Sequence, residues 1–326
     1  MLFNCMLKIF IFIYIIVSNF GKVVNMISIV GLDVGNITTV CVSDDKNVVI
    51  ESRLKEYTNL DELGENEVIE FDNKRYVVEQ GQFENNLIKH EKDNFLPLMY
   101  YAISRVTENE KVKLVIGIPA GQYNSRKDDL KEFIKENNYR RIKIGDKMRT
   151  IFIEDVKVVP ESYGLKANGI MDQCQKELNT LVVDIGGGTT DIAEFNEKGN
   201  FIGGESIKYG LLDLYRETRK VLGDKPYNLN ISLADAKRYF DGELSLLNKD
   251  TSYKQDIMLK SIKIIVNELR GLYPNLSNIN LVLTGGGAEK VYPTFKKLYE
   301  QTIPVTDIKA NAKGFYKIGV KLWQGK

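Results

Sequence analysis

The sequence predicts an α/β fold built from two related halves, and two observations lead to that prediction. Hydrophobic runs typical of buried strands alternate with helical patterns from residue 27 onward, as they do in α/β proteins. A short motif at residues 33–39 then returns at residues 184–190, each time after one strand and before another. Such self-similarity within one chain indicates that a structural unit occurs twice.

Strand and helix patterns fill the first half of the chain. Three strands open it at residues 27–32, 38–43 and 47–52, and charged, irregular sequence follows to about residue 92. The later patterns predict, in order, a helix at 95–106, a strand at 112–118, an amphipathic helix at 125–137, hairpin strands at 139–144 and 147–153, and a short strand at 156–159. Gly145 and Asp146 make the turn of that hairpin.

The second half repeats this alternation. Its patterns predict two strands joined by a glycine-rich turn at 179–184 and 190–196, helices at 211–222, 233–239 and 255–273, and a strand at 279–284 that runs into three glycines. No low-complexity linker interrupts the sequence between these elements.

Length, composition and charge narrow the class of protein. The 326 residues are 43% hydrophobic and 27% charged, which supplies apolar material for one large or two medium cores. The formal net charge is +1, so the chain as a whole has no electrostatic attraction to nucleic acid or to an anionic membrane. We therefore expect no direct DNA binding.

Cysteine and histidine usage excludes several kinds of site. The three cysteines, Cys5, Cys41 and Cys174, lack metal-ligand spacing, and their odd number argues against a disulfide scaffold. Both facts favour a reducing, cytoplasmic location. The single histidine, His90, stands in a charged stretch and is expected on the solvated surface, so a histidine-based catalytic triad is excluded.

The N-terminus carries an apolar run at residues 9–17, behind Lys8. The run is too short to span a bilayer comfortably, and it has the length of a signal-peptide core without a small-x-small cleavage site after it. We expect residues 1–25 to lie outside the fold, as an extension upstream of a start at Met26. A membrane anchor is the alternative.

The repeated motif has the chemistry of a phosphate-binding turn. Its glycines let the backbone curl tightly and approach a ligand, and successive N–H groups in such a turn can hold a phosphate. The aspartates that begin the two copies, Asp33 and Asp184, would repel a phosphate directly. They suit instead the water shell of a Mg²⁺ ion, which usually keeps several waters.

Two further segments complete the candidate site. Gly285, Gly286 and Gly287 follow a strand and open a helix, an arrangement that lets a planar ring or a ribose lie against bare backbone. Glu161 comes directly after a strand that ends at Pro160. Beside a phosphate, its carboxylate could orient or deprotonate an attacking water; otherwise it merely favours a helix dipole.

The order of these motifs resembles the actin, heat-shock-chaperone and sugar-kinase superfamily. The resemblance rests on Asp33-x-Gly35, on Pro160-Glu161-Ser162, on the segment 184–191 and on the segment 285–288, and it runs from Met26 to the C-terminus. Within the superfamily the chain looks most like the ParM-type plasmid-segregation actins, in length, in the Pro-Glu-Ser sequence and in the ending at residues 310–319. The fold that this implies is actin-like, with two related α/β domains flanking a nucleotide cleft.

The resemblance also implies roles for individual residues. Glu161 would position the attacking water, and Asp33 and Asp184 would bind Mg²⁺ through water. The nucleotide, ATP or GTP, would be held by Asp33, Gly35, Asn36, Thr38, Thr39, Asp184, Gly186, Gly187, Gly188, Thr189, Thr190, Gly285, Gly286 and Gly287. Glu217 and Lys220, on the helix at 211–222, would close over the base. No site is assigned in the variable segment from residue 46 to about 106.

Domain organisation and function follow from the same resemblance. The first domain would comprise residues 26–178 and 308–326, and the second residues 179–307, with variable subdomains at about 46–106 and 206–278. The expected function is a nucleotide-dependent, filament-forming ATPase or GTPase that segregates plasmid DNA through a DNA-binding adaptor protein. The alternatives are a membrane-associated cell-shape or division actin, and a non-polymerising ATPase or kinase of the same superfamily.

Overall fold

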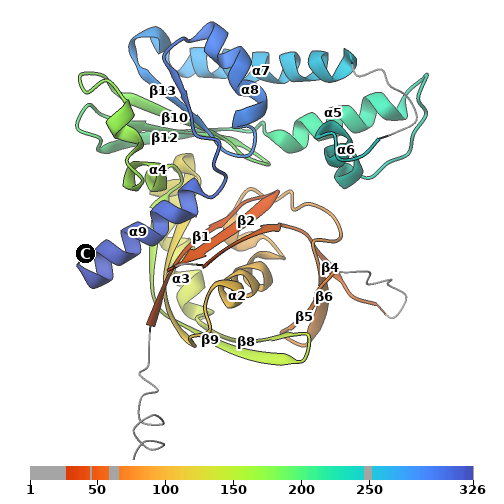
Figure 1. Cartoon of the computed structure of the whole chain (residues 1–326), viewed down its shortest axis with the longest axis vertical. Helices are drawn as coiled ribbons and strands as arrows, with labels where there is room; N and C mark the ends of the chain where they lie inside the picture. The colour runs from red at the N-terminus through yellow and green to blue at the C-terminus, as the bar shows by residue number, and fades with distance from the viewer. Residues whose placement is uncertain (1–26, 45, 59–65, 246–251, 326) are drawn as a thin grey trace, which may run out of the picture.

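The structure is a computed structural model that describes residues 27–44, 46–58, 66–245 and 252–325. Two separate sheets organise this part of the chain, one above the other in Figure 1, and the predicted α/β fold is confirmed. The predictions of an extension or a membrane anchor at residues 1–25 concern residues outside the described ranges. Among the helices of the described ranges, none combines the length and the apolar character that a membrane span needs.

The first sheet has nine strands in the order β3-β2-β1-β7-β9-β8-β5-β6-β4. They are β1 (Ile27–Val34), β2 (Thr38–Ser43), β3 (Lys46–Glu51), β4 (Leu54–Glu56), β5 (Val68–Phe71), β6 (Lys74–Val78), β7 (Lys111–Ile118), β8 (Tyr139–Ile144) and β9 (Lys147–Pro160). β7 lies parallel between β1 and β9, and β1 and β7 are mostly buried, which explains their continuous apolar sequence.

The first sheet curls round helix α2 (Phe95–Val106), as Figure 1 shows. Ten of the 12 residues of α2 are buried. A helix that is apolar on all sides is stable only inside a core, and the curled sheet provides that core. Helix α3 (Tyr123–Glu136) packs against β9 through a narrow apolar stripe formed by Leu130 and Ile134.

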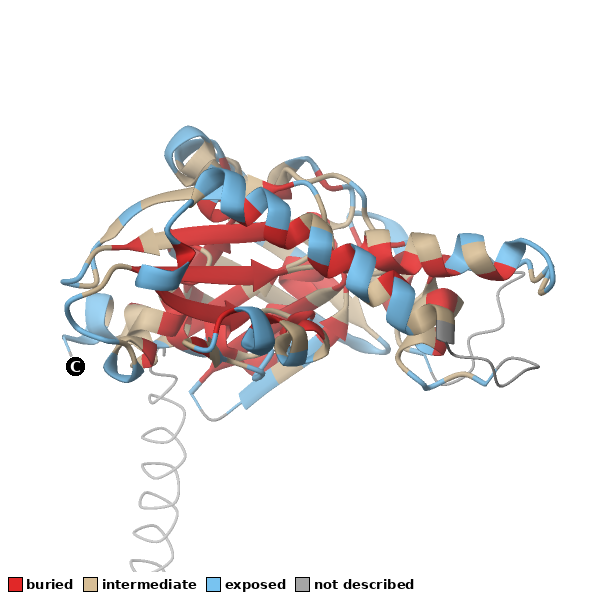
Figure 2. Cartoon of the chain, turned by 90° about the horizontal axis from the view of Figure 1, so that it is seen from above, coloured by how far each residue is buried: buried red, intermediate tan, exposed pale blue. Residues whose placement is uncertain are grey.

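The second sheet has five strands in the order β12-β11-β10-β13-β14. They are β10 (Thr180–Ile185), β11 (Thr190–Phe195), β12 (Phe201–Ile207), β13 (Asn280–Thr284) and β14 (Thr302–Pro304). β10 and β13 run parallel and are buried at every position, and Figure 2 shows buried strands in red at the centre of the molecule. The helices of this half are α5 (Leu211–Gly223), α6 (Leu233–Phe240), α7 (Ser252–Leu272) and α8 (Ala288–Leu298).

Two predictions for the first half are wrong. The strands predicted at 147–153 and 156–159 are one strand, β9, because Glu154 and Asp155 interrupt the apolar pattern at a register shift against β7 without ending the pairing. The segment expected to be irregular, up to residue 92, contains β4, β5, β6 and the short 3₁₀ helix η1 (Lys89–Glu91). β4, β5 and β6 are short and carry charged residues, and β4 is the edge strand of the sheet, where charged side chains are common.

Helix α9 (Ala310–Gln324) follows the second sheet in sequence but packs on the first, against β1, β7 and the short helix α4 (Tyr163–Ala167). The backbones approach very closely: a Cβ on Gly314 would lie 1.9 Å from the carbonyl oxygen of Gly164, and one on Gly31 would lie 2.2 Å from that of Ala312. The N-terminus of α9 therefore lies between the two halves, beside the ends of their central strands (Figure 1).

Candidate functional site

The two copies of the repeated motif form the same turn in the two sheets. In the first, the N–H of Gly35 donates to the carbonyl oxygen of Thr38 at 2.9 Å. In the second, the N–H of Gly186 donates to the carbonyl oxygen of Thr189, also at 2.9 Å. Each turn joins the central strand of its sheet, β1 or β10, to an antiparallel neighbour, β2 or β11. The internal repeat in the sequence is therefore a structural repeat.

These two turns meet face to face between the sheets. A Cβ on Gly187 would lie 2.8 Å from Cγ1 of Ile37, and a Cβ on Gly188 would lie 2.9 Å from Cδ2 of Leu87. Distances below about 3 Å are closer than carbon atoms normally approach, and the Cβ on Gly187 would also lie 2.9 Å from the backbone nitrogen of Ile37, so a side chain there would push the turns apart. The glycines of the second turn thus allow the two halves to close on each other.

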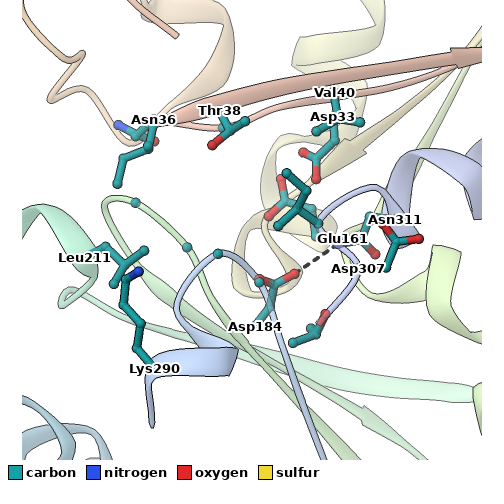
Figure 3. Close-up of a pocket in the computed structure, with 18 of the residues that line it drawn as sticks. Asp33, Asn36, Thr38, Val40, Glu161, Asp184, Leu211, Lys290, Asp307 and Asn311 are labelled. Atoms are coloured by element: carbon teal, nitrogen blue, oxygen red, sulfur yellow. Dashed lines mark hydrogen bonds between the residues drawn. The ribbon is translucent and has the colours of Figure 1, made fainter. Parts of the chain in front are cut away.

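A pocket of about 330 Å³ opens beside this contact. Figure 3 shows Asp33, Glu161 and Asp184 on one side of it, with Leu211 and Lys290 on the other. The sequence-predicted residues that line the pocket are Asp33, Gly35, Asn36, Thr38, Glu161, Asp184, Gly186, Gly187, Gly285 and Gly286. Gly188 and Thr189 line a smaller space that adjoins it. Residues from both halves therefore converge on one place.

Five of the predicted residues line neither the pocket nor the adjoining space. Thr39 and Thr190 are fully buried; the Thr39 hydroxyl bonds to that of Ser52 at 2.8 Å, and the Thr190 hydroxyl donates to a backbone carbonyl oxygen at 2.9 Å. Both point away because successive side chains of a strand alternate between its faces. Gly287 is the N-cap residue of α8, and a Cβ there would lie 2.4 Å from the Ile185 side chain, so this glycine serves packing.

The predicted base-closing residues also lie elsewhere. Glu217 is paired with Lys260 at 2.9 Å across the outer surface of α5 and α7, and Lys220 is exposed. The pocket instead meets the opposite face of α5, at Leu211 and Tyr215. On a helix, residues two and five positions beyond Tyr215 cannot share its face, which explains the error.

A buried lysine joins two of the carboxylates. Lys89, in η1, is 3% exposed, and its Nζ lies 2.6 Å from Oε1 of Glu161 and 3.2 Å from Oδ1 of Asp33. Burial alone would lower the pKa of Lys89, but the two carboxylates outweigh that effect and the net shift is upward. The charged ammonium group of Lys89 thus lies between Asp33, at the first turn, and Glu161, the residue predicted to position water.

The carboxylates of the site crowd one another. Burial raises the pKa of Glu161 to about 7, with Lys89 opposing the rise and Asp33 adding to it. Burial also raises the pKa of Asp184 well above its ordinary value, and the neighbouring Glu161, Asp33 and Asp191 raise it further. The site therefore holds more negative charge than its lysine neutralises, and a cation would relieve that excess.

Asn311, at the start of α9, bridges the two halves of the site. Its Nδ2 donates to Oδ2 of Asp184 at 2.9 Å, drawn as the dashed line in Figure 3. Its Oδ1 accepts from the N–H of Ser162 at 3.0 Å, directly after Glu161. One amide therefore fixes the aspartate of the second sheet relative to the glutamate of the first.

Several of these residues gave no recognisable signal in the sequence. Lys89 stands in a stretch of charges that resembles a solvated surface, and the neighbouring His90, expected to be exposed, is half-buried beside the ring of Phe133. Lys92 is also buried; its Nζ donates to Oδ1 of Asn36 at 3.0 Å, and burial together with the charge of Lys89 lowers its pKa to about 8. The variable segment was also expected to hold no site, so neither lysine was predicted to belong to one.

The donor set suits a hydrated divalent cation. Asp33 and Asp184 come from opposite sheets and face the same pocket, and Mg²⁺ is usually bound through one or two carboxylates together with waters and substrate phosphates. The excess negative charge around Asp184 agrees with that use. These two residues would hold the ion, and the ion would supply charge neutralisation for phosphate chemistry.

Comparisons with known proteins agree with this geometry. Residues 31–164 match the family described as the N-terminal domain of actin-like proteins. A 15-stranded ParM filament from Clostridium botulinum is similar at 17% identity and a TM-score of 0.75, over 90% of this chain and 99% of that one. The archaeal actin homologue Ta0583, solved in complex with ADP, is similar at 19% identity and a TM-score of 0.73, over 90% and 100%.

A third solved structure, the Alp12 filament, is 20% identical with a TM-score of 0.64, over 91% of this chain and 99% of that one. No curated protein matches the chain. The predicted actin-like fold is confirmed. Residues 31–164 are similar to the N-terminal domain of actin-like proteins, and the chain as a whole has the fold of the ParM filament protein and the archaeal actin homologue.

Proposed function

We propose that this chain binds ATP or GTP with Mg²⁺ between its two halves and hydrolyses the terminal phosphate. The observation that carries the proposal is the pair of matching turns, one from each sheet, that meet at a single pocket beside Asp33, Glu161 and Asp184. Turns of this kind offer backbone N–H groups to phosphate oxygens. The ADP complex of the archaeal homologue, which has the same fold, supports the proposal.

The residues at the pocket have complementary roles in this mechanism. The two turns hold the phosphates from opposite walls, and Glu161 orients the attacking water and accepts its hydrogen bond. Lys89 holds Oε1 of Glu161 at 2.6 Å, which leaves Oε2 for the water and opposes protonation of the carboxylate. Asn311 holds Asp184 at a fixed position relative to Glu161. Positioning and charge neutralisation suffice, and no covalent intermediate is required.

We further propose that hydrolysis controls assembly of the chain into filaments. The domains would be residues 26–178 with 308–326, and residues 179–307, as the placement of α9 on the first sheet supports. Since each domain holds one side of the same phosphates, phosphate release changes the angle between them, and that angle decides how subunits fit. The ParM and Alp12 relatives were solved as filaments, which supports this part of the proposal.

The cellular role that we propose is plasmid segregation in the cytoplasm, through a DNA-binding adaptor protein that links the filament to DNA. The net charge of +1 supports the need for such an adaptor, because direct binding to DNA requires clusters of Lys and Arg that neutralise phosphates. A membrane-associated cell-shape or division actin and a monomeric ATPase or kinase are the competing functions.

One experiment separates hydrolysis from assembly. Phosphate release and light scattering are followed in the same cuvette after Mg-ATP or Mg-GTP is added, with EDTA as the control. We expect scattering to rise first and then to fall as phosphate is released. Phosphate release without scattering or sedimentation would refute the filament and leave a monomeric ATPase. The absence of both would refute the proposed function, and sedimentation with lipid vesicles would favour the membrane-associated role.

A further inference from the structure

The end of the pocket away from the carboxylates is lined by three helices. Leu211 and Tyr215 come from α5, Lys237 from α6, Asp241 from the C-cap of α6, and Lys290 from α8. In Figure 3, Lys290 lies beside Leu211, on the side opposite Asp33 and Glu161. If the phosphates lie at the two turns, as proposed above, the base of the nucleotide occupies this end.

A fixed carboxylate stands in this wall. Oδ1 of Asp241 lies 2.9 Å from Nζ of Lys290, and Oδ2 lies 3.5 Å from Nζ of Lys237. The hydroxyl of Tyr215 donates to the same two oxygens at 3.4 and 3.5 Å. The Asp241 side chain is only 14% exposed, so its orientation is set by groups from all three helices. Lys237 in turn reaches Glu51 of the first sheet at 3.2 Å.

Such a wall is more polar than the packing of a planar base requires. A planar base can be held between apolar surfaces alone, yet this pocket places a carboxylate and two ammonium groups at its edge, where they lose part of their hydration. Each carboxylate oxygen accepts more than one hydrogen bond, so Asp241 keeps acceptor capacity beyond its bonds to the lysines and the tyrosine.

This arrangement matches the edge of guanine. Guanine presents two adjacent donors, N1–H and N2–H, which fit the two oxygens of one carboxylate, and next to them the acceptor O6, which fits an ammonium group. Adenine presents a single donor, N6–H, beside the unprotonated acceptor N1, whose lone pair a carboxylate repels. A site built around this carboxylate therefore discriminates against the base that turns an acceptor toward it.

We propose that the pocket selects guanine, with Asp241 accepting from N1–H and N2–H and Lys290 donating to O6, so that the substrate is GTP rather than ATP. The inference rests on the proposed function, because it takes the position of the base from the position of the phosphates. Asp241, at the C-cap of α6, then determines specificity. The sequence had suggested Glu217 and Lys220, on α5, for contact with the base.

Calorimetric titration of the full chain with Mg²⁺ and diphosphates tests the inference without interference from hydrolysis. We expect GDP to bind about 10–100-fold more tightly than ADP, since guanine offers Asp241 two donors where adenine turns an acceptor toward it. IDP lacks only the N2 amine and should bind with intermediate affinity. Asp241→Asn should abolish the preference for GDP and gain affinity for XDP, whose C2 carbonyl accepts from the new amide.

The matched control is Asp256→Asn, an exposed aspartate on α7, which should bind all four diphosphates like the wild type. Equal binding of GDP, IDP and ADP by the wild-type chain would overturn guanine selection while leaving the proposed function intact. Binding of none of them would refute the proposed function as well. If Asp241→Asn fails to fold, Lys290→Met replaces it and should lose GDP affinity selectively, and the wild-type series decides the question by itself.

Discussion

At the scale of single residues, the site is a cluster of buried charges arranged around one lysine. Lys89 neutralises part of the negative charge of Asp33 and Glu161, while Asp184 is held by the amide of Asn311. Buried ion pairs are seldom worth much for stability by themselves, but removal of one partner leaves an uncompensated charge. The cluster therefore makes the site sensitive to changes that are small in volume.

Replacement of Glu161 by glutamine should slow hydrolysis about 10²–10⁴-fold, the range typical of a positioned acid–base group. Glutamine keeps the volume and one acceptor for Lys89 but loses the charge that orients the water. Binding should be retained, because Glu161 is not part of either phosphate turn. Single-turnover phosphate release measures the effect, with Glu197→Gln, at an exposed turn, as the control. An unchanged rate would remove Glu161 from the mechanism.

Replacement of Lys89 by methionine should lower the free energy of unfolding by about 3–5 kcal/mol, because Asp33 and Glu161 lose their buried counter-charge. Mg²⁺ should restore more stability to this variant than to the wild type, since the cation relieves the same repulsion. Urea denaturation with and without Mg²⁺ tests both statements. Lys135→Met, which breaks an exposed pair with Glu132, should change stability by about 1 kcal/mol or less. A variant as stable as the wild type would contradict this account.

At the scale of elements, α9 determines how the two halves are joined. It follows the second sheet, crosses to the first, and packs on β1 and α4 through glycines that bring backbones into contact. This close packing fixes the start of α9, and with it Asn311, between the ends of the two central strands. The helix thus connects the packing of the first domain to the geometry of the site.

Gly314→Ala should destabilise the chain by about 1–3 kcal/mol or more, because its Cβ would overlap the backbone of Gly164. The control is Gly271→Ala in α7, where a Cβ meets nothing within 4 Å and alanine should stabilise the helix by about 0.5–1 kcal/mol. Thermal unfolding of the two variants should therefore shift in opposite directions. Equal shifts would show that the α9–α4 contact is not close-packed.

At the scale of the whole molecule, the two halves touch at the turns, at α9, and where residues 120–122 pack on β11 and β12. Polar contacts also join them, including Glu51 with Lys237, and Asn85 with Arg216 at 2.5 Å. A ligand held by both walls adds to these contacts and can change how firmly the halves close.

Mg-nucleotide at 100 times its Kd should stabilise the folded chain by about 2.7 kcal/mol, which raises the midpoint of thermal unfolding. Asp33→Ala and Asp184→Ala should lose most of that rise, because each removes an acceptor for the hydrated ion from one wall. Asp146→Ala, at an exposed hairpin turn, is the control and should keep it. A full rise in both site variants would show that the metal is held elsewhere.

Much of this architecture was determined by the sequence alone. The alternation of elements, the two matched turns, the glycines at 285 and 286 and the position of Glu161 after a strand were predicted correctly in place, because each depends on local backbone geometry and hydrophobic period. A turn that needs glycine, or a strand that is buried on both faces, can be recognised from a short stretch of consecutive residues.

Only the tertiary structure decided which charged side chains meet. Lys89 lies 56 residues from Asp33, and Asn311 lies 127 from Asp184, so no local pattern links them. The same holds for Asp241, which pairs with Lys290 of another helix, and for Glu217, which pairs with Lys260. A charge looks alike in a sequence whether it is solvated or buried with a partner, because its pairing depends on distant segments that only the folded chain brings within a few ångströms.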